Sequence, residues 1–140
     1  MNYKKDFDTW NGLKKSIECK QGGEAYAYPR EVWWCSLGVN LGVEIDGKNE
    51  NFERPVLIIR VYNPHSMLVL PITSKGKEDK FHCKIIVKAK NIETGELYNK
   101  PVWVKLTQAR AISNKRLLRK VDVVPVADFD IVQKAFREYL

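Results

Sequence analysis

The stretch that decides the fold covers residues 55–73 and reads PVLIIRVYNPHSMLVLPIT. Two runs of β-branched and aliphatic residues, 55–62 and 67–73, lie on either side of the turn-forming pair Asn63-Pro64. Two such runs joined by a short turn predict a β-hairpin. Pro71 has no backbone N–H to donate, so we expect it at an edge or a bulge near the end of its strand.

The same pattern extends in both directions along the chain. Short runs rich in β-branched and aromatic residues predict four further strands, over residues 31–37, 83–90, 97–106 and 120–126. Glu93-Thr94-Gly95 supplies a turn that makes a hairpin of the runs before and after it. Many short strands separated by turns are typical of a small antiparallel barrel, so the predicted fold class is mainly β with some α.

One helix is predicted before the strands and one after them. Asp6 can cap a helix over residues 6–18, which should end before Gly22-Gly23 and lead into a connection over residues 20–29. Its apolar face holds Phe7, Trp10, Leu13 and Ile17. Asp128 is the expected N-cap of the second helix, whose apolar face holds Ile131, Val132, Ala135, Phe136 and Tyr139. We therefore expect an N-terminal helical extension and linker over residues 1–28 and one barrel domain over residues 29–140.

The charge balance favours an anionic partner. Lysine and arginine total 24 against 17 acidic residues, for a net charge of +7. The cations form two groups: Arg110, Lys115, Arg116, Arg119 and Lys120, and then Lys75, Lys77, Lys80, Lys84, Lys88 and Lys90. Such groups suit phosphate backbones, and a solvated surface explains them equally well. No apolar run approaches the roughly 20 residues that span a bilayer, and the N-terminus lacks the apolar stretch of a secretion signal, so we expect a cytoplasmic protein without a membrane partner.

The cysteines and histidines do not predict a metal site. Cys19, Cys35 and Cys83 are widely spaced, with no histidine cluster at zinc-ligand spacing, so neither a metal centre nor a disulfide framework is expected. Cys35 and Cys83 lie in strand-like runs, where cysteine usually behaves as a small buried hydrophobe. His65 and His82 titrate in a useful range, and both also fit ordinary surface positions. The long loop over residues 38–53 is the first place to look for chemistry.

Four ordered segments carry a family resemblance. They are EVWWCSLGVNLGVE at residues 31–44, RPVLII at 54–59, LPITS at 70–74, and QARAI at 108–112 with Arg116-Leu117. Together they resemble the MazF/PemK family of toxin ribonucleases, whose strand-and-loop start, arginine-proline strand, threonine-bearing strand end and later Q-x-[RK] segment follow in this order. The family's G-S-E-Q corresponds here to Gly42-Val43-Glu44-Ile45, residues 48–53 are an insertion, and Arg30 replaces a glycine. These departures leave the recognised RNA sequence open.

The resemblance implies a small SH3-like, PemK-type β-barrel with a C-terminal helix, to which this chain adds an N-terminal helix. It implies a toxin of a type II toxin-antitoxin system that cleaves single-stranded RNA, in particular mRNA, at specific sequences. The reaction is attack of the ribose 2′-hydroxyl on the adjacent phosphate, and it needs no metal or other cofactor. The implied partners are a cognate antitoxin protein and a second copy of the chain in a homodimer.

The resemblance also implies catalytic roles for Arg54, Thr73 and Glu44. A guanidinium can clamp phosphate oxygens bidentately while it stays charged, so Arg54 is the expected transition-state cation; the alternative is a surface arginine at a strand start. Thr73 can donate its hydroxyl hydrogen to a phosphate oxygen, or it is simply a β-former at a strand end. Glu44 is a candidate general base, and a structural salt bridge to Arg54 is the other interpretation.

The expected RNA-binding residues lie around these three. The resemblance assigns Gln108 and Arg110 to RNA contact or dimer support, and Ser74, Lys75 and Trp34 to RNA contact. Trp33, Trp34 and Trp103 can stack bases, although successive strand residues point to opposite faces, which places at least one of Trp33 and Trp34 in the core or an interface.

Two other functions fit the same architecture. One is a gyrase-poison-like toxin without nuclease activity, and the other is a catalytically silent nucleic-acid- or protein-binding barrel. Cleavage of RNA in the presence of EDTA separates the enzyme from both.

Overall fold

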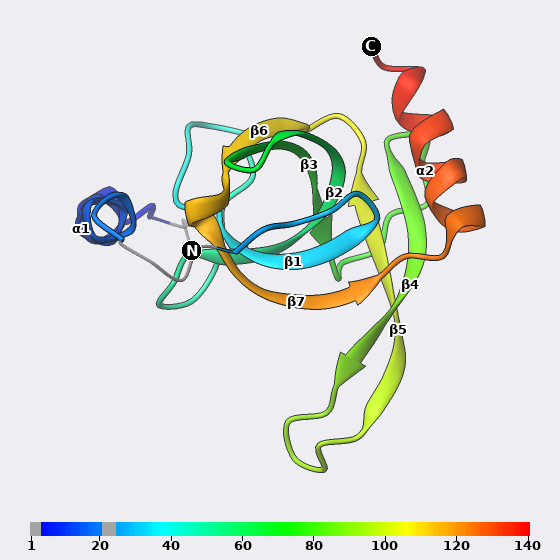
Figure 1. The fold of residues 1–140 in the computed structure, drawn as a ribbon, viewed down its shortest axis with the longest axis horizontal. Coiled ribbons are helices and arrows are strands. Elements are labelled where there is room, and N and C mark those ends of the chain that lie inside the picture. The colour runs from blue at the N-terminus through cyan, green and yellow to red at the C-terminus, as the bar shows by residue number, and fades with distance from the viewer. Residues whose placement is uncertain (1–3, 21–24) are drawn as a thin grey trace.

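The computed structural model describes residues 4–20 and 25–140, and every structural statement below concerns these residues. Seven strands and two α-helices follow one another as shown in Figure 1. Their bounds are α1 (Phe7–Glu18), β1 (Glu31–Ser36), β2 (Glu53–Asn63), β3 (Ser66–Thr73), β4 (His82–Lys90), β5 (Leu97–Lys105), β6 (Arg110–Ser113), the 3-10 turn η1 (Asn114–Arg116), β7 (Leu117–Val123) and α2 (Val126–Arg137).

The strands form one strongly curled antiparallel sheet. Its order is β4-β5-β3-β2-β1-β7, and β6 pairs with β3. Figure 1 shows β1, β2, β3, β6 and β7 closing into a ring, with the far end of the β4–β5 hairpin projecting away from it. The outermost strands, β4 and β7, are linked by the Lys88 amide, which donates to the Asp122 carboxylate at 2.8 Å. The predicted mainly β, barrel-like fold with two helices is confirmed.

Both predicted hairpins are present, and one expectation needs correction. Residue Asn63 pairs with Ser66 across the first turn, and Lys90 pairs with Leu97 across the second. Pro71, however, lies on the interior strand β3 and not on an edge strand or at a bulge. On one side it pairs with Val56; on the other side β6 pairs with residues 66–69 and β5 with residues 72–73. The missing N–H of Pro71 therefore lies in the gap between two ladders, where none is needed.

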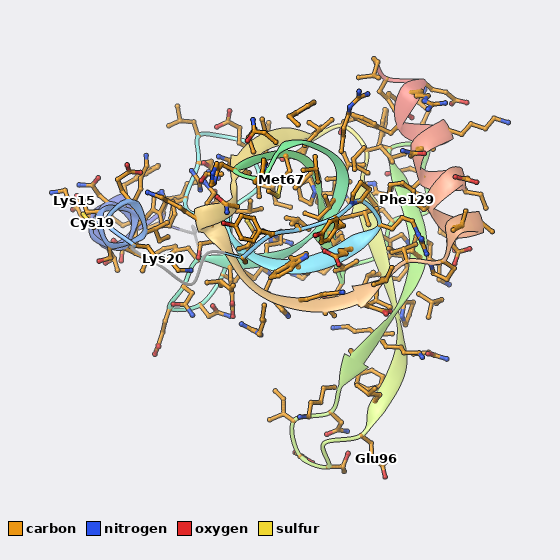
Figure 2. The ribbon with its side chains drawn as sticks, in the orientation of Figure 1. Lys15, Cys19, Lys20, Met67, Glu96 and Phe129 are labelled. Atoms are coloured by element: carbon orange, nitrogen blue, oxygen red, sulfur yellow. The ribbon has the colours of Figure 1, made fainter. Side chains whose placement is uncertain are left out.

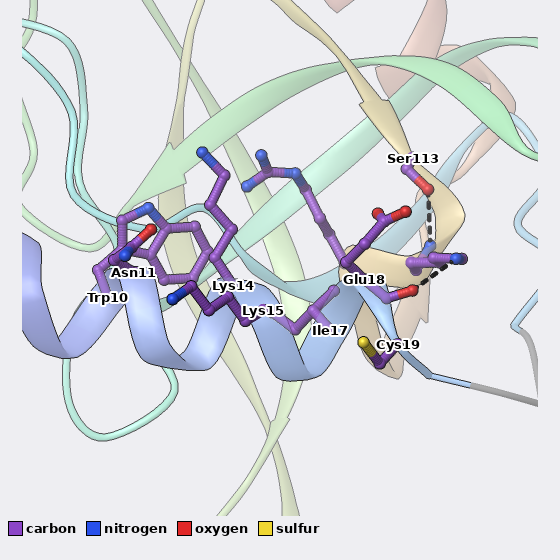
Figure 3. A pocket seen from close by; sticks show the side chains of 10 residues that line it. Trp10, Asn11, Lys14, Lys15, Ile17, Glu18, Cys19 and Ser113 are labelled. Atoms are coloured by element: carbon purple, nitrogen blue, oxygen red, sulfur yellow. Dashed lines mark hydrogen bonds between the residues drawn. The ribbon is translucent and has the colours of Figure 1, made fainter.

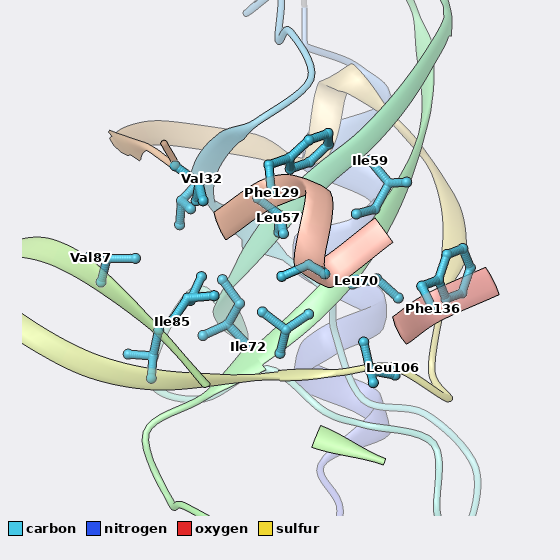
Figure 4. Close-up of a cluster of buried hydrophobic side chains, with 14 residues drawn as sticks. Val32, Leu57, Ile59, Leu70, Ile72, Ile85, Val87, Leu106, Phe129 and Phe136 are labelled. Atoms are coloured by element: carbon cyan, nitrogen blue, oxygen red, sulfur yellow. The ribbon is translucent and has the colours of Figure 1, made fainter. Parts of the chain in front are cut away.

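The continuous apolar run of the central hairpin is explained by two cores. Val56 and Ile58 point into a cluster inside the ring of strands, where Figure 2 labels Met67. Leu57 and Ile59 point to the other face of the sheet, into a cluster covered by α2, which Figure 4 shows. A strand that is buried on both faces has no polar alternation, because each face needs apolar side chains.

The C-terminal helix begins earlier than its sequence suggests. Its N-cap is Pro125, which makes no side-chain cap bond, and Asp128 lies within the first turn. The expectation that Asp128 caps the helix was wrong: the fixed φ of proline favours an earlier start, and an acid in the first turn still interacts favourably with the helix dipole. Phe129 contributes to the buried face, whereas Ile131, expected there, is 61% exposed.

The N-terminal helix is capped as expected and docks through one residue. The Thr9 amide donates to the Asp6 carboxylate at 3.0 Å. Trp10 is the buried residue of α1, while Phe7 is 45% exposed. The helix ends at Glu18, before Gly22-Gly23 as predicted; residues 21–24 of the expected connection lie outside the described residues. Neither of the described helices is long and apolar enough to cross a membrane.

Candidate functional site

Four side chains form a row across the strands β2, β3, β5 and β4. Val56 pairs with Pro71, and continuing this antiparallel register by two residues brings Arg54 opposite Thr73. Thr73 pairs with Trp103, and Trp103 pairs with Lys84. Side chains of directly opposed residues lie on the same face of a sheet. The fold thus brings together two of the three predicted catalytic residues, Arg54 and Thr73, beside an aromatic ring and a lysine.

Arg54 is held by backbone oxygens on both sides. Its Nε donates to the carbonyl of Asp46 at 2.8 Å, and its Nη1 donates to the carbonyl of Ile72 at 3.3 Å. Partial burial lowers the pKa of Arg54, and the nearby negative charge of Asp46 opposes that shift. Arginine remains charged at working pH despite such a shift, because its usual pKa is so high. A cation fixed before its ligand arrives needs little reorganisation during a reaction.

A pocket of about 520 Å³ opens beside Arg54. It is lined by Asp46, Gly47, Lys48, Asn49, Phe52 and Arg54, and so lies between the start of β2 and the second half of the 38–53 loop. The backbone turns sharply here: Asn49 and Phe52 have φ of +59° and +48°. The pocket is wide enough for a phosphate group, and its cations are Arg54 and Lys48.

Thr73 and the two residues after it form the end of β3. Thr73 is half-buried, and its hydroxyl oxygen accepts from the Lys75 amide at 3.2 Å, which leaves the hydroxyl hydrogen for another acceptor. Ser74 and Lys75 are exposed. The following loop passes close to Trp103, since a Cβ atom added at Gly76 would meet the indole at 2.5 Å. The two predicted RNA-binding residues here are thus accessible beside Thr73.

Positive charge concentrates next to this row. Burial lowers the pKa of the Lys105 ammonium, and the charges of Arg54 and Lys77 lower it further. Lys84 lies over the Trp103 ring, with its Nζ 5.8 Å from the ring centroid. Like charges held together cost free energy unless an anion joins them, so the cluster of Arg54, Lys77, Lys84 and Lys105 suits a phosphate chain.

Glu44 lies further from Arg54 than the resemblance suggested. It is exposed, and its carboxylate accepts from the Leu41 amide at 3.0 Å within its own loop. Among the described ion pairs none joins Glu44 to Arg54. The acid whose charge acts on Arg54 is Asp46, two residues further along.

Gln108 and Arg110 are bonded to the loop and to the end of β1. The Gln108 side chain accepts from the Ile45 amide at 2.7 Å and donates to the Val43 carbonyl at 3.2 Å. Arg110 donates to the Leu37 carbonyl at 3.4 Å. Both side chains therefore support the loop that borders the Arg54 pocket.

Trp33 and Trp34 point to different faces, as expected. Trp33 packs against the cluster inside the ring, and its indole N–H donates to Glu31. Trp34 is covered by the Arg119 guanidinium, 5.0 Å from its ring centroid, and Arg119 also pairs with Glu53 at 3.1 Å. A base that stacks on Trp34 has to displace Arg119 or stack on its guanidinium.

The remaining titratable residues lie outside the row. His82 pairs with Asp79 at 2.8 Å, and the His65 ring lies 6.4 Å from that of Tyr26. Cys35 is fully buried, as expected, and burial raises its pKa to about 12; Cys83 is partly buried. Over the described residues, no three His, Cys, Asp or Glu side chains are grouped so as to hold a metal ion.

A second pocket, of about 470 Å³, separates α1 from the barrel. Figure 3 shows it between Trp10, Lys14, Ile17 and Cys19 of α1 and its C-cap and Ser113 of β6. The dashed lines mark Lys115, whose amide donates to Ser113 at 3.1 Å and whose Nζ donates to the Glu18 carbonyl at 2.9 Å. The pocket lies away from Arg54 and Thr73, neither of which lines it.

Two residues of the site were missed by sequence reasoning. Asp46 follows the matched loop motif by two positions, and its importance comes from the folded loop, which turns its carbonyl toward Arg54. Lys105 ends a predicted strand, and the alternation of β5 gives the only signal: Val102 and Val104 are buried, so Trp103 and Lys105 share the opposite face.

Comparisons with known proteins agree on the family. The family model described as "PemK-like, MazF-like toxin of type II toxin-antitoxin system" matches residues 28–140. No curated protein matches the sequence. The solved toxin MazF-mt6 from Mycobacterium tuberculosis is similar at 16% identity, with a TM-score of 0.56 over 79% of this chain and 95% of that one.

Two further solved structures, both mycobacterial, share the fold at 11% identity. One is an endoribonuclease, with a TM-score of 0.53 over 84% of this chain and 94% of that one. The other is an endoribonuclease in complex with its cognate antitoxin, with a TM-score of 0.55 over 81% of this chain and 93% of that one. Since the family model covers most of the chain and the fold agrees with it, this chain belongs to the PemK-like, MazF-like toxin family of type II toxin-antitoxin systems.

Proposed function

We propose that this toxin is a metal-independent endoribonuclease that cleaves single-stranded RNA, mRNA in particular, at specific sequences. The observation that carries the proposal is the register that sets Arg54 opposite Thr73, with Lys105 and Lys77 close by. Phosphoryl transfer needs positioned cations and hydrogen-bond donors where charge develops. The row provides both within one face of the sheet.

The proposed reaction is an internal transfer at one phosphate. The ribose 2′-oxygen forms a bond to phosphorus, the bond from phosphorus to the 5′-oxygen breaks, and the products carry a 2′,3′-cyclic phosphate and a 5′-hydroxyl. The 2′-hydroxyl proton passes to a base, for which Glu44 is the candidate from the resemblance, and the leaving 5′-oxygen gains a proton. Arg54 neutralises the charge that builds on the phosphorus oxygens, and Thr73 donates its hydroxyl hydrogen to one of them.

RNA is proposed to lie over the row and the adjoining loop. Ser74 and Lys75 are exposed next to Thr73 and are proposed to contact the backbone. Trp103 is a stacking candidate, while Trp34, with Arg119 above it, is a candidate for the flanking bases. Gln108 and Arg110 act in this proposal mainly through the loop that they support.

The proposed partners follow from the family. We propose a cognate antitoxin, a homodimer and a cytoplasmic location, in line with the complex solved for a mycobacterial member. Sedimentation at micromolar concentration is expected to give twice the mass of the 140-residue chain. A single monomeric species at that concentration contradicts the homodimer.

The experiment that tests the function is incubation of the purified protein with a long single-stranded RNA in EDTA. The expected result is a discrete set of fragments with cyclic phosphate and 5′-hydroxyl ends, and mapping those ends gives the recognised sequence. Intact RNA contradicts the proposal and favours a gyrase-poison-like or purely binding role. Cleavage only after a divalent metal is added contradicts the metal-independent route.

A further inference from the structure

The residues before α1 hold the loop beside Arg54. Lys5 donates through its Nζ to the carbonyl of Asn40 and, at 3.0 Å, to the carbonyl of Gly42. The same Nζ pairs with the Asp46 carboxylate at 3.5 Å, and the Lys5 side chain is only 20% exposed. One ammonium thus ties three points of the 38–53 loop together.

Trp10 of α1 holds the two ends of the same loop. Gly38 at its beginning has φ of +83°, and a Cβ atom there would lie 2.1 Å from the Trp10 indole. Phe52 at its end lies with its ring centroid 5.6 Å from that of Trp10. The guanidinium of Arg116 lies 5.7 Å from the Trp10 ring, whose residue is 6% exposed. Such close approach to a glycine requires a surface shaped for the indole.

Asp46 connects these contacts to Arg54. Its carboxylate, which pairs with Lys5, also accepts from the Asn40 amide at 2.7 Å. Its carbonyl accepts from the Arg54 Nε at 2.8 Å. A single residue therefore lies between the Lys5 ammonium and the Arg54 guanidinium.

We infer that the N-terminal extension is a positioning element for the site: Lys5 acts through Asp46, and Trp10 acts through Gly38 and Phe52, to fix Arg54. The extension lies outside residues 28–140, the part that the family model matches. The identity of the reaction rests on the proposed function, but the contact with the loop does not. Lys5 is a positioning residue here, because it reaches the reacting atoms only through Asp46.

A competing role for Lys5 is direct attraction of RNA. An exposed cation that only attracts the substrate changes KM, whereas a group that sets the transition-state geometry changes kcat. Misplacing a catalytic group slightly has large kinetic effects. The two roles therefore separate in steady-state kinetics.

The kinetic test compares Lys5→Ala, Lys5→Arg, Asp46→Asn and the double variant Lys5→Ala/Asp46→Asn on one RNA. Lys4→Ala is the matched control, since it removes the same charge from the exposed neighbour. We expect Lys5→Ala to lower kcat about tenfold with KM within about twofold, and Lys5→Arg to restore most of kcat. The double variant should lose no more than the Asp46 variant. A loss confined to KM, or equal to that of Lys4→Ala, overturns the inference.

A second readout requires no nuclease activity. Hydrogen exchange at the Asn40 and Gly47 amides, both bonded within the loop, should rise in Lys5→Ala relative to Lys4→Ala, while amides of the β2–β3 ladder stay protected. Unchanged exchange at Asn40 and Gly47 overturns the inference. If the parent protein leaves RNA intact but the exchange rises as expected, the proposed function fails and the positioning contact stands.

Discussion

At the scale of single residues, the site depends on an arginine that is bonded before any ligand binds. Arg54 donates to two backbone oxygens from different segments, those of Asp46 and Ile72. Only a forked head can reach two such oxygens and still present N–H groups to a phosphate. A lysine at this position keeps the charge and loses that geometry.

Lys105 is expected to weaken the fold while it supports RNA binding. Its pKa is lowered by burial and by Arg54 and Lys77, so its charged form is less favourable in the folded protein than in the unfolded chain. Lys105→Met should therefore raise the melting temperature at neutral pH. It should also weaken RNA binding and reduce the salt dependence, the slope of log K against log salt, by about 0.7.

The sign of the pH dependence follows from the same shift. Between the lowered folded pKa and the usual value near 10.5, the unfolded chain binds more protons at Lys105, so stability contributed by this group rises with pH. Thermal melts of wild type and Lys105→Met over the alkaline range should converge as pH increases, with Lys90→Met as an exposed control. Equal melting temperatures at neutral pH, together with unchanged RNA affinity, contradict this account of Lys105.

The three cysteines are expected to react at very different rates. At pH 8 a pKa of about 12 leaves roughly one part in ten thousand of Cys35 as thiolate, and the side chain is also fully buried. Cys19 is exposed and Cys83 is partly buried. A thiol reagent should modify Cys19 first, Cys83 slowly, and Cys35 only after unfolding.

Mass-spectrometric mapping of the labelled sites over time checks this order. The Cys19→Ser variant serves as control and should lack the fast phase. Labelling of Cys35 in the native protein at the rate of Cys19 contradicts the buried position of β1 in the ring.

At the scale of elements, the 38–53 loop is built like a small domain of its own. The amide of Gly47 donates to Gly38 at 2.8 Å, and Lys48 and Glu53 exchange two backbone bonds of 2.8 Å. Asn40 adds side-chain bonds to the carbonyls of Leu37 and Ile45. The loop therefore keeps one shape although it contains no helix and only a single β-bridge.

Gly47→Ala is expected to open this loop. The added Cβ atom would lie 1.6 Å from the Phe52 carbonyl oxygen, so the backbone has to shift. We expect the free energy of unfolding to fall by about 1–3 kcal/mol and RNA cleavage to fall with it. Denaturant unfolding and cleavage rates measure the two effects.

Gly12→Ala in α1 is the matched control. No atom lies within 4 Å of its added Cβ, and alanine is the better helix former by about 0.5–1 kcal/mol, so this variant should be as stable as wild type or more so. A Gly47→Ala protein that equals it in stability and activity contradicts the packing of the loop.

Element types followed from the sequence more readily than their partners did. The two central strands were predictable because apolar runs of their length fit no exposed element, yet their division between two cores appears only in the structure. Strand β6 was missed because its four residues are too few to show a period. Pro71 was misplaced because no local pattern reveals that β3 exchanges β6 for β5 there.

The site was predictable as far as local motifs reach. Arg54 and Thr73 stand in short motifs, and strand pairing brought them together. Asp46 and the extension could not be predicted, because their contacts join residues 5, 40, 46 and 54 through loop geometry. Glu44, assigned by the motif, instead bonds within its own loop.

At the scale of the whole molecule, the two basic groups have different fates. Members of the later group are bound internally: Arg110 to Leu37, Lys115 to Glu18, Arg116 to Ser36, Arg119 to Glu53 and Lys120 to Glu31. In the earlier group, Lys77 and Lys84 lie beside Lys105 and Trp103. The charge available to RNA is therefore concentrated next to Arg54 and Thr73, on the same face of the curled sheet.

The central claim is that Arg54, held opposite Thr73, stabilises the transition state of RNA cleavage. Single-turnover cleavage of one mapped RNA in EDTA by wild type, Arg54→Lys and Arg54→Ala tests it most directly, with RNA binding measured alongside. We predict cleavage at least about 100-fold slower for both variants, with circular dichroism spectra that match wild type and with affinity reduced much less. Cleavage by Arg54→Ala at the wild-type rate would contradict the account.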